Sequence, residues 1–308
     1  MYDRLLRAAL SMTRQCWEQG MLSYALLQCG EKQLLSIAVH DMVLRQSRDG
    51  RLCNVEDTPA VTDSAFCIPA VWALREKEEY RKAAERNVDF LLNRAERAAD
   101  GTLFHVRSTT QIWADSAAFL PYALALTGHE DAAVLQMRGI LSRLYLPESG
   151  LYAHIWDEEK AALTDPRAWG VGNGWILTGL WRTSQCLKER QNPQWKRLRD
   201  LFYALLFAML RHMTKEYGFC DVLDEPDSFR ESETAAMVAL GLIAAVKAGE
   251  MERTYLDTAL SIRKRLLEQT DENGLVWSAS SSPFFDRPGT AVECQAHMMM
   301  LEKTAEGL

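Results

Sequence analysis

The sequence predicts an all-α fold, a ring of six inner and six outer helices known as an (α/α)6 barrel. Three observations lead to this fold class. A glycine-led unit recurs along the chain, each unit contains one apolar and one half-polar helix, and the helices of each kind number six. Because an apolar helix must be buried and a half-polar helix faces water, the two kinds form an inner and an outer layer.

The repeating unit begins at a glycine and ends in an apolar helix followed by a charged one. Its leading glycines are Gly50, Gly101, Gly150, Gly218 and Gly274, and a spacing of roughly 50–60 residues is typical of repeat architectures. After each glycine come a few extended apolar residues and a polar loop. The second unit shows this most clearly, because Gly101-Thr-Leu-Phe-His precedes the helix that starts at Asp115-Ser-Ala-Ala-Phe.

The helices of both layers can be counted from their expected first residues. Inner helices are expected to begin near residues 16, 62, 114, 173, 232 and 291. Outer helices are expected near residues 32, 78, 130, 193 and 250, with Tyr2–Ser11 as the sixth. An open solenoid would expose the apolar last inner helix, Glu293–Glu302, so we expect the ring to close. No linker or low-complexity tract interrupts the chain, and residues 1–308 are expected to form a single domain.

Several helix ends follow from the pattern of charges and turn residues. Gly30 is expected to terminate the helix Cys16–Gln28, and the third helix, Lys32–Ser47, should stop before Arg48-Asp49-Gly50. The glycine-rich stretch Gly170-Val-Gly-Asn-Gly is expected in a loop between helices. The remaining outer helices are expected at Lys77–Glu96, Glu130–Leu144, Pro193–Thr214 and Glu250–Gln269.

Composition restricts the classes of partner and cofactor. The net charge is 35 − 42 = −7 without any basic block, which argues against nucleic acid and anionic membranes as partners. The seven cysteines show no CxxC and no paired spacing, a pattern typical of reduced, buried thiols in a cytoplasmic protein. No secretory signal or membrane span is recognised in the sequence. Metal-ligand spacings, P-loops and dinucleotide fingerprints are missing, so no metal or cofactor is expected.

A polar residue stands near the start of five of the expected inner helices. These residues are Asp63, Asp115, Asn173, Glu233 and Glu293. Each of them alone could simply cap its helix, because an oxygen there accepts bonds from unpaired backbone N–H groups. Since the inner helices of a closed ring start at the same end, we expect the five side chains to converge on one concave site.

Aromatic residues and histidines crowd the same loops. We assign Trp113, Trp169 and Trp175 to the site, although tryptophans also serve as core residues with one polar edge. His105 and His154 each follow a leading glycine by four residues in consecutive units, which favours a shared role over two unrelated structural histidines. Aromatic faces together with carboxyl and amide groups suit a carbohydrate ligand.

The carboxyl groups are the best candidates for catalysis. Glycosidic chemistry generally uses one protonated carboxyl as the general acid and a second polar group that holds substrate or water. Asp115 lies beside Trp113 and an apolar run, so we expect desolvation to raise its pKa towards the working range. Asp63 holds the equivalent place one unit earlier and is expected to face the same site.

Three segments carry a resemblance to a known family. Trp113-Ala-Asp115 with its apolar helix, Gly150-Leu-Tyr-Ala-His154-Ile-Trp-Asp157 and Trp169-Gly-Val-Gly-Asn-Gly-Trp175 resemble the unsaturated glucuronyl and rhamnogalacturonyl hydrolases of glycoside hydrolase families 88 and 105. The order and spacing match along most of the chain, including the segment Glu233-Thr-Ala-Ala-Met. The resemblance implies an (α/α)6 barrel, in agreement with the helix count.

The resemblance also implies a reaction. These enzymes remove a 4,5-unsaturated uronic acid from the non-reducing end of short oligosaccharides, here most simply of pectin or rhamnogalacturonan type, by hydrating the enol-ether double bond. By position Asp115 matches the general acid and base, and Asp63 matches the second acid, which binds substrate hydroxyls. His105, His154 and Trp169 match residues that line the sugar subsite.

One position departs from the family pattern. The family loop usually reads Trp-x-Arg-Gly-Asn-Gly-Trp, and Val171 stands here at the arginine position. A guanidinium at this place could pair with the substrate carboxylate, which valine cannot do. Either another cation replaces it, or the substrate differs. The arginines available in these loops are Arg107, Arg167, Arg230 and Arg287.

Two other functions stay open at the level of sequence. One is a different sugar enzyme on the same ring, such as an epimerase or another glycosidase. An epimerase would rely on His105 and His154 as its acid and base. A non-catalytic carbohydrate-binding relative would retain the aromatic residues without turnover. The sequence contains no indication of oligomeric state.

Overall fold

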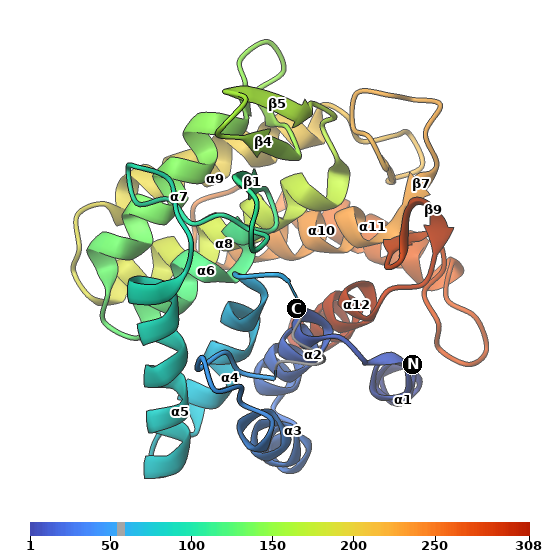
Figure 1. Cartoon of the computed structure of the whole chain (residues 1–308). Coiled ribbons are helices and arrows are strands. Elements are labelled where there is room, and N and C mark those ends of the chain that lie inside the picture. The colour runs from blue at the N-terminus through green and yellow to red at the C-terminus, as the bar shows by residue number, and fades with distance from the viewer. Residues whose placement is uncertain (54–58) are drawn as a thin grey trace.

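The computed structural model describes residues 1–53 and 59–308. Within these ranges the chain forms twelve α-helices, joined by loops that contain a few short strands (Figure 1). The helices are α1 (Tyr2–Met12), α2 (Cys16–Cys29), α3 (Lys32–Leu44), α4 (Ile68–Ala73), α5 (Glu78–Asp89), α6 (Ser116–Leu126), α7 (Glu130–Leu144), α8 (Gly170–Glu189), α9 (Trp195–Leu210), α10 (Ser232–Lys247), α11 (Thr254–Glu268) and α12 (Val292–Ala305).

The helices form the closed double ring that the sequence predicts. The inner ring runs from α2 through α4, α6, α8, α10 and α12, and each member packs against the next. Contacts between α12 and α2 close the ring, and α1 covers α12 as the sixth outer helix (Figure 1). The remaining outer helices are α3, α5, α7, α9 and α11. Both the (α/α)6 architecture and the role of the N-terminal helix are therefore confirmed.

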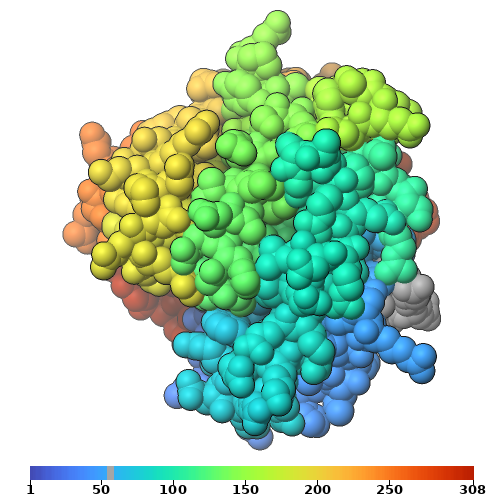
Figure 2. Space-filling model, turned by 60° about the vertical axis from the view of Figure 1, so that its left-hand side comes forward, coloured from blue at the N-terminus to red at the C-terminus, as the bar shows by residue number. Residues whose placement is uncertain are grey.

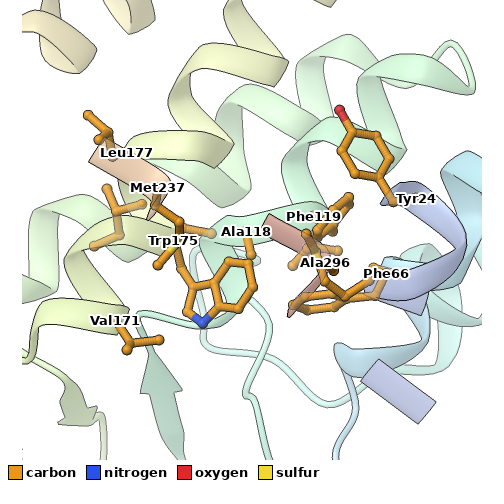
Figure 3. Close-up of a cluster of buried hydrophobic side chains, with 14 of the residues drawn as sticks. Tyr24, Phe66, Ala118, Phe119, Val171, Trp175, Leu177, Met237 and Ala296 are labelled. Carbon is orange, nitrogen blue, oxygen red and sulfur yellow. The ribbon is translucent and has the colours of Figure 1, made fainter. Parts of the chain in front are cut away.

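The inner layer is packed by small and aromatic side chains. In Figure 3, Phe119 and Ala118 of α6 lie between Trp175 of α8 and Tyr24 of α2. The ring centroids of Tyr24 and Phe119 are 5.0 Å apart in an edge-to-face arrangement. The outer helices cover this core, and the face that Figure 2 presents is formed largely by α5, α7 and α9 with their connecting loops.

Two helices differ from the sequence prediction in form. The inner helix expected from residue 62 begins as a 3-10 helix, η1 (Asp63–Cys67), and only then becomes α4, which has a proline in its first turn. Helix α5 continues into a π-helical turn, η2 (Phe90–Arg94), so the predicted span to residue 96 is nearly complete. The third helix ends at Leu44, three residues earlier than expected.

The segments after the leading glycines are held by side-chain amides. Four of the five glycines have a positive φ, whereas at the fourth unit Tyr217 takes that conformation in place of Gly218. The residue two positions after the glycine donates its backbone N–H to an amide oxygen in four units. The four amides are Asn87, Gln136, Asn173 and Gln295. Each ties an extended segment to the helical ring, because a backbone N–H buried at this depth needs a partner.

The stretch Gly170–Gly174 forms the first turn of α8, so its prediction as a loop is wrong. The glycines allow close packing, which neither composition nor periodicity reveals. A Cβ atom at Gly174 would lie 2.2 Å from the side chain of Met237. Further along the helix, one at Gly179 would lie 1.9 Å from the carbonyl oxygen of Ala117. The glycines thus bring α8 against both of its inner neighbours.

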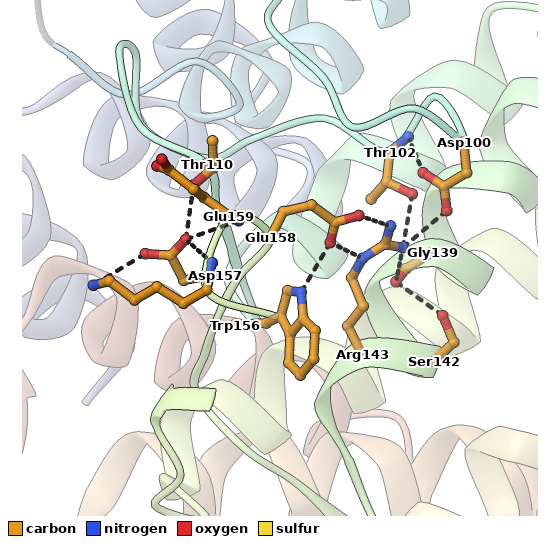
Figure 4. Close-up of polar contacts among 11 residues, drawn as sticks. Asp100, Thr102, Thr110, Gly139, Ser142, Arg143, Trp156, Asp157, Glu158 and Glu159 are labelled. Atoms are coloured by element: carbon orange, nitrogen blue, oxygen red, sulfur yellow. Dashed lines mark hydrogen bonds and ion pairs between the residues drawn. The ribbon is translucent and has the colours of Figure 1, made fainter. Parts of the chain in front are cut away.

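Short strands position the loops at one end of the ring. A three-stranded antiparallel sheet joins β1 (Gln111–Trp113), β4 (Ile155–Asp157) and β5 (Ala162–Asp165). Arg143 of α7 holds the turn between β4 and β5 by donating to Glu158 at 2.7 Å (Figure 4). The same guanidinium also donates to Asp100 at 2.9 Å. The other strands pair as β2 (Tyr145–Leu146) with β3 (Leu151–Tyr152), β6 (Phe219–Cys220) with β7 (Arg230–Glu231), and β8 (Ala279–Ser281) with β9 (Phe284–Gly289).

Within the described residues no helix is both long and apolar enough to span a bilayer. All seven cysteines are free and buried, as their scattered spacing predicts.

Candidate active site

A cavity of about 330 Å³ opens where the inner helices start. Carboxyl groups from four different helix starts line it, namely Asp63, Asp115, Glu233 and Glu293. The convergence expected from the repeat is therefore observed for these four. Of the other site candidates, Trp113, Trp169, Trp175 and His105 also line the cavity.

Asp115 lies at the end of β1, where the strand turns into α6, and faces the imidazole of His154. Asp115 Oδ2 is 3.3 Å from His154 Nε2, and the Asp115 side chain is 23% exposed. The geometry is that of an ion pair, since within the described residues neither atom makes a well-directed hydrogen bond. The expectation of a raised Asp115 pKa is wrong. Burial does raise the pKa of Asp115, but the adjacent imidazolium of His154 outweighs burial and lowers the pKa below its usual value.

His154 lies between two carboxylates, Asp115 at the start of α6 and Asp165 at the end of β5. Its Nδ1 lies 2.9 Å from Oδ2 of Asp165, the last residue of β5, and Asp165 also accepts from Arg167 at 2.6 Å. Burial lowers the pKa of His154, but the carboxylates of Asp115 and Asp165 on either side of the ring raise it to about 9. At neutral pH the imidazole is therefore a cation between two carboxylates.

His105 has the opposite character. Its Nδ1 lies 2.7 Å from the Thr62 hydroxyl and 3.0 Å from the Ser116 hydroxyl, and its ring stacks on Trp113 with centroids 4.6 Å apart. Burial lowers the pKa of His105 to about 4, so the ring is neutral. Its Nε2 is 3.7 Å from Asp63 Oδ1, which is too long for a hydrogen bond.

Asp63 is the aspartic acid of the cavity whose pKa is raised into the neutral range. It opens η1 and is 6% exposed. Burial raises the pKa of Asp63 to about 7, and the negative charges of Asp115 and Glu293 add to the rise. Of the two aspartic acids Asp63 therefore has the raised pKa and Asp115 the lowered one, whereas the sequence-based expectation gave the raised pKa to Asp115.

Two glutamic acids complete the carboxyl set. Burial, followed by the charge of Glu18, raises the pKa of Glu293 to about 7. Burial also raises the pKa of Glu233 well above its usual value, and its Oε1 lies 3.4 Å from His297 Nδ1. Because burial strongly lowers the pKa of His297, Glu233 and His297 form a buried neutral pair, in which Glu233 lines the cavity and His297 lies behind it.

Aromatic rings form one continuous side of the site. His154 lies between Trp113 and Trp169, with centroid distances of 5.4 and 4.6 Å. Trp169 in turn meets Phe285 edge to face at 6.1 Å and donates its indole N–H to Asp221 at 3.1 Å. Such a surface offers flat apolar area beside polar groups, as sugar rings require.

Asn173 does not share the cavity, contrary to the sequence prediction. Its amide is used completely by the backbone, because it accepts from Tyr152 N–H at 2.9 Å and donates to the carbonyl oxygens of Tyr152 and Trp169. It is 1% exposed. Asn173 is therefore one of the four amides that hold the repeat together, and its polar position at a helix start has a structural cause.

None of the four candidate arginines is among the described residues that line the cavity. Each contacts another group of the protein. Arg107 pairs with Asp49, Arg167 with Asp165, Arg230 with the Cys220 sulfur, and Arg287 lies over the Phe284 ring.

The comparison with known families agrees with this site. The family model described as Glycosyl Hydrolase Family 88 matches residues 7–283. The chain belongs to this family.

Relatives of this family-88 chain are distant in sequence. An unsaturated rhamnogalacturonyl hydrolase, YesR of Bacillus subtilis, is 24% identical over 226 residues, which cover 69% of the chain and 62% of the relative. The match therefore spans less than two thirds of that enzyme's length.

Solved structures of similar fold cover the chain more fully. A family 105 glycoside hydrolase of C. acetobutylicum has a TM-score of 0.82 at 18% identity, covering 100% of this chain and 99% of its own. An unsaturated glucuronyl hydrolase from Bacillus sp. GL1 has a TM-score of 0.71 at 17% identity, covering 95% and 86%. At these identities the likeness establishes the fold.

Several residues of this family-88 site were not assigned from the sequence. Trp17, Phe66 and Ser280 line the cavity, and His297 lies beside Glu233. Glu293 was expected in the site, because it stands at the start of its helix as Glu233 does and thus carried a usable signal. His297 carried no such signal, since a histidine inside an apolar helix is expected to be a core residue.

Proposed function

We propose that this protein is a hydrolase that removes a 4,5-unsaturated uronyl group from the non-reducing end of short oligosaccharides, of pectin or rhamnogalacturonan type. The observation that carries the proposal is the pair of aspartic acids in one cavity, Asp63 with its pKa raised by burial to about 7 and Asp115 with its pKa lowered beside His154. Family membership and the unsaturated rhamnogalacturonyl hydrolase among the relatives support the same reaction.

The pair can supply both proton transfers that hydration of an enol ether needs. The neutral carboxyl of Asp63 donates its proton to C4 of the double bond, which leaves an oxocarbenium ion at C5. Water adds at C5 as the Asp115 carboxylate takes its proton, giving a hemiketal. The hemiketal opens to a ketone at C5, and the hemiacetal left at C1 releases the remaining sugar. Exchange with solvent returns the proton from Asp115 to Asp63.

In this scheme His154 keeps Asp115 ionised. Its imidazolium also compensates the negative charge that would otherwise raise the pKa of every carboxyl in the cavity. We further propose that His105, Trp113, Trp169, Trp175 and Glu233 bind the sugar. The buried hydroxyls of Thr62 and Ser116 fix the ring of His105, so that its Nε2 faces the cavity as a neutral group.

An epimerase that uses two histidines as acid and base is less well supported. Such a pair works best with pKa values near 7. Here the pKa of His105 is lowered to about 4 and that of His154 is raised to about 9. Asp63, whose pKa is raised to about 7, meets this criterion, whereas neither histidine does.

We also propose that residues 1–308 act as one catalytic domain in the cytoplasm. The continuous ring of helices supports the first point, and the seven free thiols support the second.

The test is turnover of unsaturated disaccharides from pectin, rhamnogalacturonan and glycosaminoglycans, followed by the ultraviolet absorbance of the conjugated double bond. Wild type should consume at least one of them. Asp63→Asn and Asp115→Asn should each lower the rate at least about a hundredfold, the scale of a lost acid or base. Near-normal activity in either variant would refute the assignment, and binding without turnover by wild type would favour a carbohydrate-binding protein.

A further inference from the structure

The cavity is unusual in its balance of charged side chains. Four carboxyl groups line it, yet no lysine or arginine occurs among its described lining residues. Segment 54–58 lies outside the described residues, and its sequence, Asn-Val-Glu-Asp-Thr, contains no lysine or arginine either. A ligand that enters this cavity therefore meets no guanidinium or ammonium group from its walls.

The positive charges nearby are already neutralised by the protein. The imidazolium of His154 lies between Asp115 and Asp165, at 3.3 and 2.9 Å. Arg51 is 1% exposed and donates to Asp49 at 2.9 Å and to the Ala60 carbonyl at 3.0 Å. Both cations serve internal partners, so neither is positioned as the counter-ion of a ligand.

Part of the cavity wall is apolar. Val171 lies in the first turn of α8 and is 3% exposed, and it lines the cavity together with Trp169 and Phe285. The side chain of Val171 offers no polar atom to a ligand in the cavity. Moving a carboxylate from water against such a surface without a cation costs several kcal/mol, whereas an ester loses far less.

We propose that the cavity accepts an unsaturated uronyl group whose carboxyl is esterified, as in methyl-esterified uronate, in preference to the free carboxylate. The ester places an alkyl group against Val171 and Phe285, and its oxygens accept hydrogen bonds from protonated carboxyl groups of the cavity. Val171 is then the residue that sets the preference. This inference deepens the proposed function and rests on it.

The experiment compares two matched substrates, an unsaturated digalacturonate with a free carboxylate on its unsaturated residue and the same compound methyl-esterified there. Wild type should show a higher kcat/KM for the ester. Esterification also changes the intrinsic reactivity of the double bond. The deciding quantity is therefore the ratio of kcat/KM for the ester to kcat/KM for the free acid, compared between variants. Val171→Arg should lower this ratio at least about tenfold, mainly through a lower KM for the free acid.

Two further variants keep the test independent of folding. Val171→Leu retains an apolar wall and should keep the wild-type ratio. Phe285→Arg introduces the cation from β9, where the side chain is 45% exposed and has room, and should lower the ratio as Val171→Arg does. Circular dichroism checks that each variant is folded.

The outcomes separate the two proposals. If wild type consumes neither substrate nor any other unsaturated disaccharide, the proposed function fails and the ester preference with it. If wild type prefers the free acid, or if the ratio is unchanged in both arginine variants, the ester preference fails while the hydrolase function stands.

Discussion

Replacing Asp165 by asparagine tests the electrostatic design of the site at a residue outside the cavity lining. Asp165 holds His154 Nδ1 at 2.9 Å, and His154 in turn holds Asp115. The asparagine side chain has the same shape but no charge. It should therefore lower the pKa of His154 and raise that of Asp115 without moving either residue far.

The size of the effect follows from the structure. Despite burial, which opposes it, Asp115 and Asp165 raise the pKa of His154 from 6.5 to about 9, a difference worth roughly 3 kcal/mol in favour of the imidazolium. If Asp165 supplies about half of this, the variant loses roughly 1–2 kcal/mol. Because the folded-state pKa lies above the unfolded value, this stabilisation is fully present below pH 6.5 and is lost as pH rises through about 9.

Two assays follow. Chemical denaturation of Asp165→Asn should show a loss of roughly 1–2 kcal/mol at pH 6 that largely disappears at pH 10. An NMR titration of the six histidines should show the pKa of His154 lowered by at least about one unit. Asp157→Asn is the matched control, because Asp157 lies on the same sheet and accepts from Thr110 rather than from His154. An unchanged His154 pKa, or an equal stability loss at both pH values, would refute the reasoning.

Three other changes test separate parts of the structure. The kcat/KM of wild type should fall as pH rises through about 7, where Asp63, the proposed general acid, ionises. The variant Glu293→Gln should show the same fall, and its absence in this variant would assign the role of general acid to Glu293. Asn173→Ala should lower stability by roughly 2–4 kcal/mol with little change in KM, since its amide serves three buried backbone groups; a large rise in KM in a stable variant would restore it to the binding site. Glu231→Gln should lower thermal stability by roughly 1–3 kcal/mol, because the Glu231 carboxylate caps α10 and also accepts from Ser280 N–H; the exposed Glu268→Gln serves as control, and an equal melting temperature would contradict the capping role.

The ring could be predicted because its signals are local and repeated. Apolar helices such as α6 differ from half-polar ones such as α7 over their whole length, and Glu130–Leu144 was predicted to the residue. The convergence of Asp63, Asp115 and Glu233 followed from ring closure alone. These predictions need only the pattern along the chain.

Properties that depend on three-dimensional neighbours could not be predicted. The pKa of Asp115 is set by His154, 39 residues away in sequence, and the local apolar run suggested the opposite sign. Asn173 and the glycines of α8 gave the same signal as a binding loop, yet their cause is hydrogen bonding to Tyr152 and close packing against Met237. A residue that pairs buried backbone N–H and C=O groups and a residue that binds a ligand can be of the same type at the same kind of position, so the sequence alone does not distinguish them.

The central claim is that Asp63 and Asp115 hydrate a carbon–carbon double bond before the glycosidic bond breaks. A single-turnover experiment with quenched samples can follow both events, the double bond by its ultraviolet absorbance and the released sugar by its reducing end. The account predicts that absorbance is lost no later than sugar is released, and that both events vanish in Asp63→Asn and Asp115→Asn. Release of a monosaccharide whose double bond is still intact would contradict it.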